Sequence, residues 1–185
     1  MSYEDFTAVP RSVAYRLIHP RPVAVIMARD GSGKVNGMTA SWVTPLSHSP
    51  LLLGVSIAPS RYTYGLIKET GEFTVNVFTK KYLKQVYFIG TTSGRDVDKL
   101  KQVELTLRES KKVRVPHLAE ALAVLECRVE KEVEVGDHAL FVARVVEAYA
   151  KKGTFDEIYD PKKAKILLHF GGSGYTTITD ETLKP

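Results

Sequence analysis

The chain of 185 residues has one cysteine, Cys127, which excludes an internal disulfide framework. No apolar run approaches the roughly 20 residues that span a bilayer. Residues 1–12 also lack the basic-then-apolar pattern of a secretory signal. These absences predict a cytoplasmic protein that does not enter a membrane. Asparagine and glutamine are scarce while lysine, glutamate, arginine and valine are abundant, a bias that favours a heat-adapted source.

Four kinds of functional motif are also missing. No GxGxxG or GxSxG run occurs, so neither a dinucleotide-binding turn nor a serine hydrolase elbow is expected. Gly31–Lys34 is similar to part of a phosphate loop, but Ala28 replaces its first glycine and Val35 its hydroxyl residue. The five histidines show no metal-ligand spacing. We therefore expect no metal site and no acyl-transfer chemistry, and we interpret Gly31–Lys34 as a hairpin turn.

The formal net charge of +5 has two interpretations. Positive charge favours anionic ligands such as nucleotides or phosphates, but a mixed-charge surface with surplus lysine has the same net charge. The basic residues form no block and no stripe interleaved with aromatic residues, as nucleic-acid binding requires. The net charge is therefore compatible with a small anionic ligand, and a nucleic-acid partner is not expected.

The hydrophobic pattern predicts many short strands. From Leu125 to Val135 every second residue is apolar except Lys131, and a Gly136–Asp137 turn then leads into a second long strand. Apolar or alternating runs predict strands at 23–28, 34–40, 51–58, 72–78, 125–135, 138–149, 166–170 and 175–178.

Glycine and proline mark the breaks between these strands. Pro45 and Pro50 bracket residues 44–49, which we expect to lie outside the regular sheet. The other expected elements are a helix at 62–70 ended by Gly71, a helix at 81–89 ended by Gly90, a charged turn or short helix at 95–99, and a short element at 12–17 within an N-terminal arm of residues 1–20.

The fold class that fits this pattern is mainly β with short helices. Tight turns between neighbouring strands favour antiparallel pairing, and the βαβ rhythm of a parallel sheet is absent. A sheet of about seven or eight antiparallel strands must protect its edges, and closure into a barrel does so. We expect one domain over residues 1–185.

The segment from Asn36 to Tyr64 carries most of the candidate chemistry. Small residues in Thr39–Trp42 leave the backbone accessible to the edge of a flat heterocycle. Ser60–Thr63 places a basic side chain between hydroxyl groups at an expected helix start, which suits a phosphate. Together these features predict a phosphorylated aromatic cofactor without identifying it.

A series of short runs follows a fixed order along the chain: NGMTASW at 36–42, SP at 49–50, SRYTY at 60–64, GEFTVNV at 71–77, SGRDVDK at 93–99, GDH at 136–138, LHFGG at 168–172, and Tyr175. Together they resemble the flavin reductase-like, FMN-binding split-barrel family, and most of all its flavoredoxin branch. The resemblance covers about residues 20–177. It implies an antiparallel Greek-key split β-barrel that forms a homodimer and holds FMN near the subunit interface.

The resemblance also implies roles for individual residues. Four would lie along the isoalloxazine edge, where backbone N–H groups bind its polar atoms: Thr39, Ala40, Ser41 and Trp42. Three would hold the phosphate: Ser60, Arg61 and Thr63. Three would lie beside the ribityl chain: Ala58, Pro59 and Tyr64. Two are candidates for reaching the flavin from its far side or from the other subunit: Lys99 and His169.

Each of these roles has a structural alternative. Trp42 could be a core aromatic residue, Arg61 could cap a surface turn, and His169 could be a structural histidine. The hydroxyls of Thr39–Ser41 could be ordinary strand hydroxyls. The charged run 95–99 could be a solvated loop.

The implied function is that of an FMN-dependent oxidoreductase. NAD(P)H or another reductant would deliver a hydride or electrons to flavin N5, and reduced FMN would pass them on. Such chemistry belongs to the cofactor, so no catalytic side chain is expected. One alternative is a flavoredoxin-type electron carrier reduced by a protein partner, since no separate dinucleotide motif is visible. Another is a non-enzymatic flavin-binding module.

Overall fold

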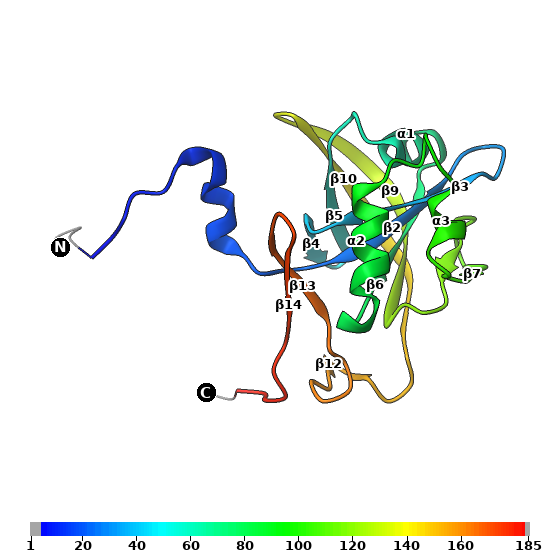
Figure 1. The fold of residues 1–185 in the computed structure, drawn as a ribbon. Coiled ribbons are helices and arrows are strands. Elements are labelled where there is room, and N and C mark those ends of the chain that lie inside the picture. The colour runs from blue at the N-terminus through cyan, green and yellow to red at the C-terminus, as the bar shows by residue number, and fades with distance from the viewer. Residues whose placement is uncertain (1–4, 184–185) are drawn as a thin grey trace.

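The computed structural model describes residues 5–183, and its largest unit is an antiparallel sheet (Figure 1). Within these residues the sheet has seven strands in the order β3-β2-β6-β9-β10-β5-β4. Their bounds are β2 Ala24–Arg29, β3 Val35–Ala40, β4 Val43–His48, β5 Leu51–Ile57, β6 Glu72–Val77, β9 Ala123–Val135 and β10 His138–Ala150. The prediction of a mainly β, antiparallel chain is confirmed.

Smaller sheets and short helices surround the large sheet. The three-stranded sheet consists of β1 (Arg21–Pro22), β13 (Leu167–Gly171) and β14 (Gly174–Thr177). The two-stranded sheets are β7 (Leu107–Arg108) with β8 (His117–Leu118), and β11 (Phe155–Asp156) with β12 (Ile158–Tyr159). The α-helices are α1 (Tyr62–Thr70), α2 (Leu83–Thr91) and α3 (Lys99–Gln102), and the 3₁₀ helices are η1 (Arg11–Ile18) and η2 (Lys80–Tyr82).

The two edges of the large sheet are consecutive in the chain. β3 ends at Ala40 and β4 begins at Val43, so only Ser41 and Trp42 connect opposite edges. The Ser56 N–H on β5 donates to the carbonyl oxygen of Trp42 (3.0 Å) and ties this connection to the β4 side. Because three peptide units span at most about 10 Å, the sheet must curl until its edges meet. It therefore closes as a barrel.

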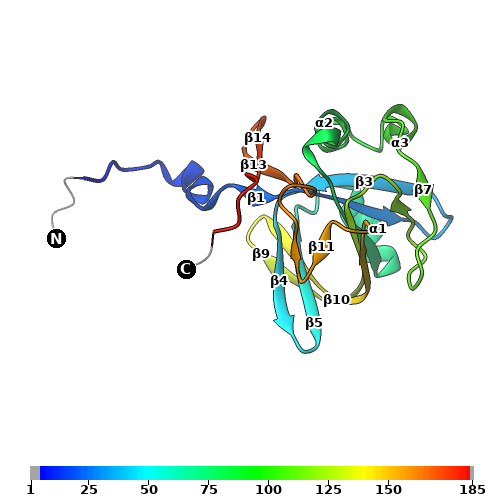
Figure 2. The ribbon, with the colours of Figure 1, turned by 90° about the horizontal axis from the view of Figure 1, so that it is seen from below.

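β2 is buried on both faces, which explains its almost continuous apolar sequence. Ile26 packs in the barrel interior with Phe73 and Phe141, and α1 adds apolar side chains to this interior. Val25 and Met27 belong to a second core, with side chains from α2, α3 and the following loop. In Figure 2, α2 and α3 lie together on one side of the barrel. β2 and β3 are therefore the barrel strands that separate the barrel interior from these helices.

The structure corrects the expectation that residues 44–49 lie outside the sheet. β4 covers Val43–His48 and pairs with β5, with a register shift between Pro45 and Ser47. Because β4 is an edge strand, Pro45 can lack its N–H there without breaking the sheet's hydrogen-bond ladder. The two prolines therefore do not exclude a strand.

Gly90 does not end α2, which continues to Thr91 and so corrects the predicted boundary. A Cβ atom on Gly90 would lie 2.9 Å from Cβ of Thr39. This glycine allows α2 to approach β3 closely, and the approach matters because β3 carries the candidate ring site.

β6 is not half-buried as predicted, since Thr74 and Asn76 on its polar face are inaccessible to solvent. The Asn76 side-chain oxygen accepts from the Leu118 N–H (2.8 Å), and the Thr74 hydroxyl donates to the Pro116 carbonyl (3.0 Å). A loop therefore covers the face that the alternating pattern assigned to solvent.

The same loop is anchored by Glu126, which lies in the polar row of β9 and is nevertheless fully buried. Its carboxylate accepts from the backbone N–H groups of Lys111 (2.8 Å), Lys112 (2.6 Å) and Val113 (3.2 Å). The Tyr149 hydroxyl also donates to it (3.1 Å). One carboxylate thus accepts hydrogen bonds from three consecutive backbone N–H groups. We call residues 110–116, the segment that it anchors, the strap.

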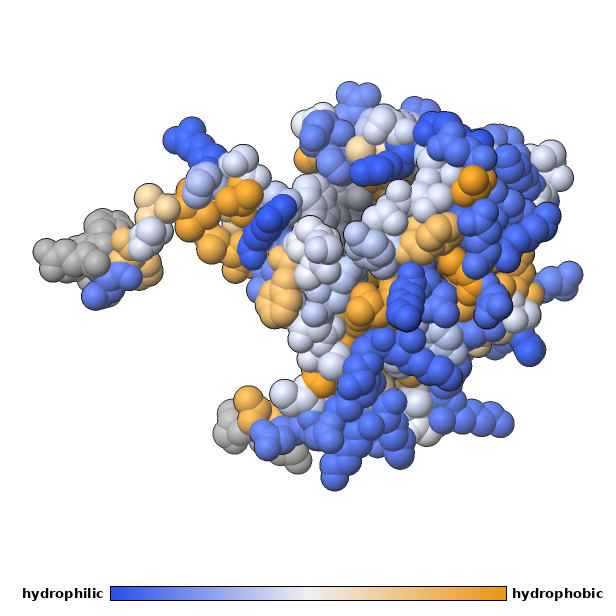
Figure 3. Space-filling model, in the orientation of Figure 1, coloured by the Kyte–Doolittle hydropathy of each residue, from blue (hydrophilic) through white to orange (hydrophobic). Residues whose placement is uncertain are grey.

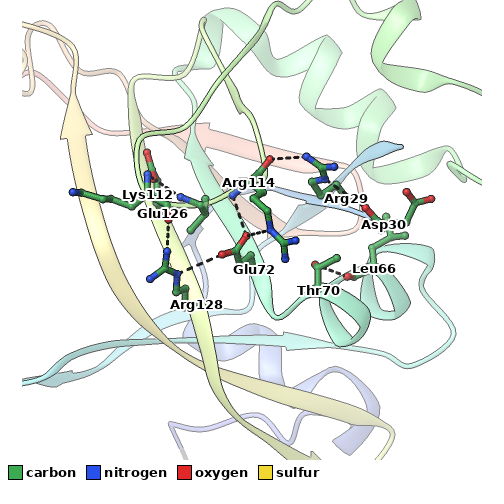
Figure 4. A network of polar contacts seen from close by, with 10 residues as sticks. Arg29, Asp30, Leu66, Thr70, Glu72, Lys112, Arg114, Glu126 and Arg128 are labelled. Carbon is green, nitrogen blue, oxygen red and sulfur yellow. Dashed lines mark hydrogen bonds and ion pairs between the residues drawn. The ribbon is translucent and has the colours of Figure 1, made fainter. Parts of the chain in front are cut away.

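A neighbouring carboxylate adds to this attachment (Figure 4). Glu72 on β6 accepts from the Arg114 backbone N–H (2.9 Å) and pairs with the guanidinium groups of Arg114 and Arg128. Arg29 of β2 donates to the Arg114 carbonyl (3.2 Å). The strap is therefore bound to β2, β6 and β9 together.

The N-terminal arm extends away from the barrel in both views (Figures 1 and 2). The predicted element at 12–17 is η1, Arg11–Ile18, and residues 1–4 of the expected arm lie outside the described part of the chain. Hydrophobic residues gather on the arm in Figure 3, and Leu17 and Ile18 are each 70% exposed. Among residues 5–183, no helix is long and apolar enough to cross a membrane.

Candidate functional site

The phosphate-type segment folds as a tight turn that opens α1. The Arg61 N–H donates to the Ala58 carbonyl (2.9 Å), and the helix begins at Tyr62. Arg61 occupies the N-cap position without a side-chain hydrogen bond to the helix, so the first N–H groups of α1 have no capping side chain. The helix ends as predicted at Gly71, which adopts the left-handed conformation (φ 68°).

A cavity of about 280 Å³ opens at this helix start. Its walls come from β3, the turn before α1, the end of α2 and the loop that follows α2. Three cationic side chains line it, Arg61, Arg95 and Lys99, and its described walls include no carboxylate. We call this cavity the cationic pocket, because its described walls carry positive side chains and no negative one.

Thr63 is held in the pocket wall by Asn36 of β3. The Asn36 amide donates to the Thr63 hydroxyl oxygen (2.8 Å), and both side chains are buried. Because that oxygen accepts from Asn36, the Thr63 hydroxyl keeps its own proton for a second acceptor. Thr63 is therefore set to donate.

Lys99 is a buried cation, 4% exposed, at the base of the pocket. Its ammonium donates to the carbonyl oxygens of Ile89 (2.7 Å) and Thr92 (2.8 Å). Loss of hydration, and secondarily the positive charge of Arg61, lowers the pKa of Lys99 to about 8. A bound anion would oppose both effects.

Arg95 was not among the predicted site residues, although it lies within the SGRDVDK run. Its guanidinium donates to the Ser60 carbonyl (3.0 Å) and lies 5.4 Å from the centre of the Tyr62 ring. Asn36 was also missed, because its role depends on a partner in another element. The alternative of a purely solvated 95–99 loop does not hold for Lys99, which is buried, whereas Arg95 lines the pocket with an exposed side chain.

The predicted ring-edge residues continue along β3 beyond the pocket. The Thr39 hydroxyl donates to the Val86 carbonyl of α2 (2.5 Å), so only the backbone of this residue is left to face a ligand. Trp42 packs 4.8 Å from the His138 ring, and Arg21 lies 5.7 Å from the Trp42 ring centre. β3 pairs only with β2 in the described sheet, so its other edge offers unpaired backbone groups.

Other predicted residues lie outside the pocket wall. Tyr64 donates to Glu132 (2.5 Å) and packs 5.5 Å from the ring of Phe141, on the barrel side of α1. Ala58 and Pro59 belong to the turn but do not line the pocket. His169 lies on β13, where its Nε2 is 3.0 Å from the Gly172 carbonyl oxygen and its ring is 5.0 Å from that of Tyr175. The structure thus gathers Ser60, Arg61, Thr63 and Lys99 and leaves His169 apart.

The length of the site fits a phosphorylated heterocycle. From Asn36 at the pocket to Trp42 the chain extends about 20 Å, at about 3.3 Å per strand residue. The pocket end supplies cations, hydroxyl donors and helix N–H groups, whereas the Trp42 end supplies an open strand edge and aromatic rings. A ligand with an anionic end and a planar end matches both. A larger cavity of about 450 Å³ near Tyr149 and Tyr159 contains none of the predicted site residues.

Comparisons with known proteins agree with this geometry. Residues 15–179 match the model of the flavin reductase like domain. An uncharacterized protein of Archaeoglobus fulgidus is 46% identical over 165 residues, which cover 89% of this chain and 93% of that protein. The reductase component of a 4-nitrophenol 4-monooxygenase/4-nitrocatechol 2-monooxygenase from Rhodococcus opacus is 31% identical over 149 residues, which cover 80% of this chain and 77% of that protein.

Solved structures share the whole fold. An FMN-binding protein from Thermus thermophilus, crystallised with p-hydroxybenzaldehyde, is 33% identical with a TM-score of 0.83, over 100% of this chain and 99% of that chain. The flavoredoxin of Methanosarcina acetivorans is 29% identical with a TM-score of 0.85, over 97% of this chain and 94% of that chain. The chain therefore belongs to the flavin reductase-like family, and its barrel is a split barrel like those of these structures.

Proposed function

We propose that this chain binds FMN, with the phosphate in the cationic pocket and the isoalloxazine ring along the free edge of β3. The observation that carries the proposal is the gathering of Arg61, Arg95 and Lys99 around one cavity whose described walls hold no carboxylate. The FMN-binding protein of Thermus thermophilus, alike over its whole length, supports the same ligand. When bound, FMN supplies the redox chemistry, taking up a hydride or electrons and passing them on.

The protein's part is to bind and orient. The Thr63 hydroxyl and the first N–H groups of α1 would donate to the phosphate, and the cations would balance its charge. The backbone of residues 39–42 would donate to the polar edge of the ring. α2 is held against β3 by the hydrogen bond from Thr39 to Val86 and by the close approach at Gly90, which keep one wall of the site in place.

We further propose that the chain is an oxidoreductase reduced by NAD(P)H or another reductant. The similarity to the reductase component from Rhodococcus opacus supports this. Purified protein should carry, or acquire on adding FMN, the absorbance of a bound flavin, and anaerobic NADH or NADPH should bleach it. Protein that stays colourless in the presence of FMN would contradict the proposal at its first step.

The similarity to the flavoredoxin of Methanosarcina acetivorans favours a second candidate, an electron carrier reduced by a protein partner. Stopped-flow mixing of the FMN-loaded protein with NADH and with NADPH separates the two. Bleaching within a turnover time supports the reductase. Bleaching only by dithionite or a reduced redox protein supports the carrier.

A homodimer is the assembly that we propose, because the arm carries apolar side chains that the described chain does not cover. Leu17 and Ile18 are each 70% exposed on η1, whose described residues include none that is buried. Covering such a stripe with a second copy would remove apolar area from water. Light scattering should give twice the mass of one chain. The double variant Leu17→Ser with Ile18→Ser should lower the measured mass toward that of a single chain. A wild-type monomer at micromolar concentration would refute the dimer.

A further inference from the structure

One exposed side chain, that of Arg95, lines the solvent-facing side of the cationic pocket. Arg95 reaches from the loop after α2 to the Ser60 carbonyl (3.0 Å), and its guanidinium lies 5.4 Å from the centre of the Tyr62 ring. Among the described residues its side chain makes no other hydrogen bond and no ion pair. Most of the five guanidinium N–H groups are therefore left for a ligand inside the pocket.

The loop that carries Arg95 is fixed on both sides. Before Arg95, a Cβ atom on Gly94 would overlap the side-chain oxygen of Asn36 and would lie 3.2 Å from Cδ1 of Tyr62. The Lys99 ammonium holds the loop at the Thr92 carbonyl (2.8 Å). The Arg95 N–H also donates to the Ser93 hydroxyl oxygen (3.2 Å). The backbone at Arg95 therefore cannot shift without breaking packing against β3 and α1, and its exposed side chain is held over the pocket by the contacts with Ser60 and Tyr62.

The contact between Arg95 and Ser60 matters for the kind of phosphate that the pocket accepts. A terminal phosphate monoester ends in oxygens that cations and helix N–H groups can surround. A diphosphate that continues into a second nucleotide needs a way out of the pocket beyond its first phosphorus atom. Ser60 and Arg95 are both exposed, so their contact lies on the solvent side of the pocket, where that extension would leave.

We propose that Arg95 is a specificity-determining residue, which makes this site select FMN over both riboflavin and FAD. The inference rests on the proposed flavin function. Riboflavin has no phosphate and leaves the charges of Arg61, Arg95 and Lys99 unbalanced. FAD has a phosphate but can enter only if the contact between Arg95 and Ser60 opens.

The test is calorimetric titration of flavin-free protein with riboflavin, FMN and FAD, for the wild type and three variants. Arg95→Ala removes the guanidinium, and Arg95→Lys keeps the charge but not the planar fork that reaches Ser60. Arg108→Ala is the matched control, an exposed arginine outside the pocket. Circular dichroism checks that each variant is folded.

We expect the wild type to bind FMN at least about tenfold more tightly than riboflavin or FAD, a difference of about 1.4 kcal/mol. Arg95→Ala should weaken FMN binding by about tenfold or more and leave riboflavin binding within about twofold, because it removes one charge-assisted contact. It should also narrow or reverse the preference for FMN over FAD. The FMN affinity of Arg95→Lys should lie between those of the wild type and Arg95→Ala, and Arg108→Ala should bind all three flavins as the wild type does.

Two results would overturn this selectivity. One is wild-type protein that binds FAD as tightly as FMN. The other is an Arg95→Ala variant that loses affinity equally for all three flavins, since that would show a purely structural role. The first result includes a wild type that binds all three flavins equally, which would contradict the selectivity and leave the flavin function intact. A wild type that binds none would contradict both.

Discussion

Lys99 shows how one residue can couple the cationic pocket to pH. Its ammonium is buried beside Arg61 without a carboxylate, so its pKa is lowered to about 8 from 10.5, first by burial and then by Arg61. In the flavin-free protein it is therefore charged below pH 8 and mostly neutral above. A phosphate favours the charged form, so affinity and protonation are linked.

We predict that FMN affinity falls as pH rises through 8, because deprotonation of Lys99 removes one charge that faces the phosphate. The affinity should also rise from pH 5 to 7, since a phosphate monoester gains its second charge near pH 6. Titrations between pH 5 and 9.5 should give a maximum near pH 7. Lys99→Met should bind FMN more weakly and lose only the alkaline decline. A wild-type profile that stays flat from pH 7 to 9.5 would contradict this role.

At the scale of elements, the strap depends on the buried carboxylate of Glu126. We predict that Glu126→Gln lowers the free energy of unfolding by about 3 kcal/mol, because an amide cannot accept from three backbone N–H groups and Tyr149 together. That corresponds to a melting temperature lower by about 6–12 °C. Calorimetry of Glu126→Gln and of Glu109→Gln, an exposed control, tests this. Equal melting temperatures would contradict it.

α1 and α2 offer a matched pair of glycines. A Cβ on Gly65 of α1 would meet nothing within 4 Å, whereas one on Gly90 of α2 would press on Thr39. We predict that Gly65→Ala stabilises the protein by about 0.5–1 kcal/mol. Gly90→Ala should destabilise it, because overpacking costs about 1–3 kcal/mol. It should also weaken FMN binding by moving α2 from β3. Urea unfolding and FMN titration give both values, and equal stabilisation by the two variants would refute the packing argument.

The sequence predicts these elements well where local patterns decide them. The 125–150 hairpin follows from strict alternation, and α1 follows from the turn before it and Gly71 after it. The sequence-based prediction fails where contacts with a distant segment determine burial or the end of an element. Glu126 lies in a polar row that the strap covers, Asn76 in one covered at Leu118 of β8, and Gly90 serves a contact with β3 instead of a helix end.

The candidate site divides in the same way. Ser60, Arg61 and Thr63 are adjacent in the chain, so their spacing alone indicates the phosphate end of the site. Lys99 was a weaker candidate taken from the resemblance. Arg95 and Asn36 join the pocket only because β3, α1 and the loop after α2 meet there. No pattern within a short stretch of sequence predicts that these three segments lie together.

For the whole molecule, the most consequential feature is the two-residue connection between β3 and β4. Other barrel pairings join distant positions, such as Val55 with Phe141 and Phe73 with Cys127. Closing these large loops carries the entropic cost of folding, whereas the junction at Ser41–Trp42 is local. The barrel can therefore reopen at this junction without releasing its long-range pairings.

The proposed ring site lies along this junction. A bound flavin would therefore affect the unfolding rate of the barrel more than its folding rate. We predict that FMN slows unfolding in denaturant jumps and leaves the refolding rate unchanged, since interactions made after the transition state affect only unfolding. An FMN-dependent refolding rate would show instead that the junction forms early. With an unchanged refolding rate, the flavin would set the half-life of the folded barrel against heat and proteases.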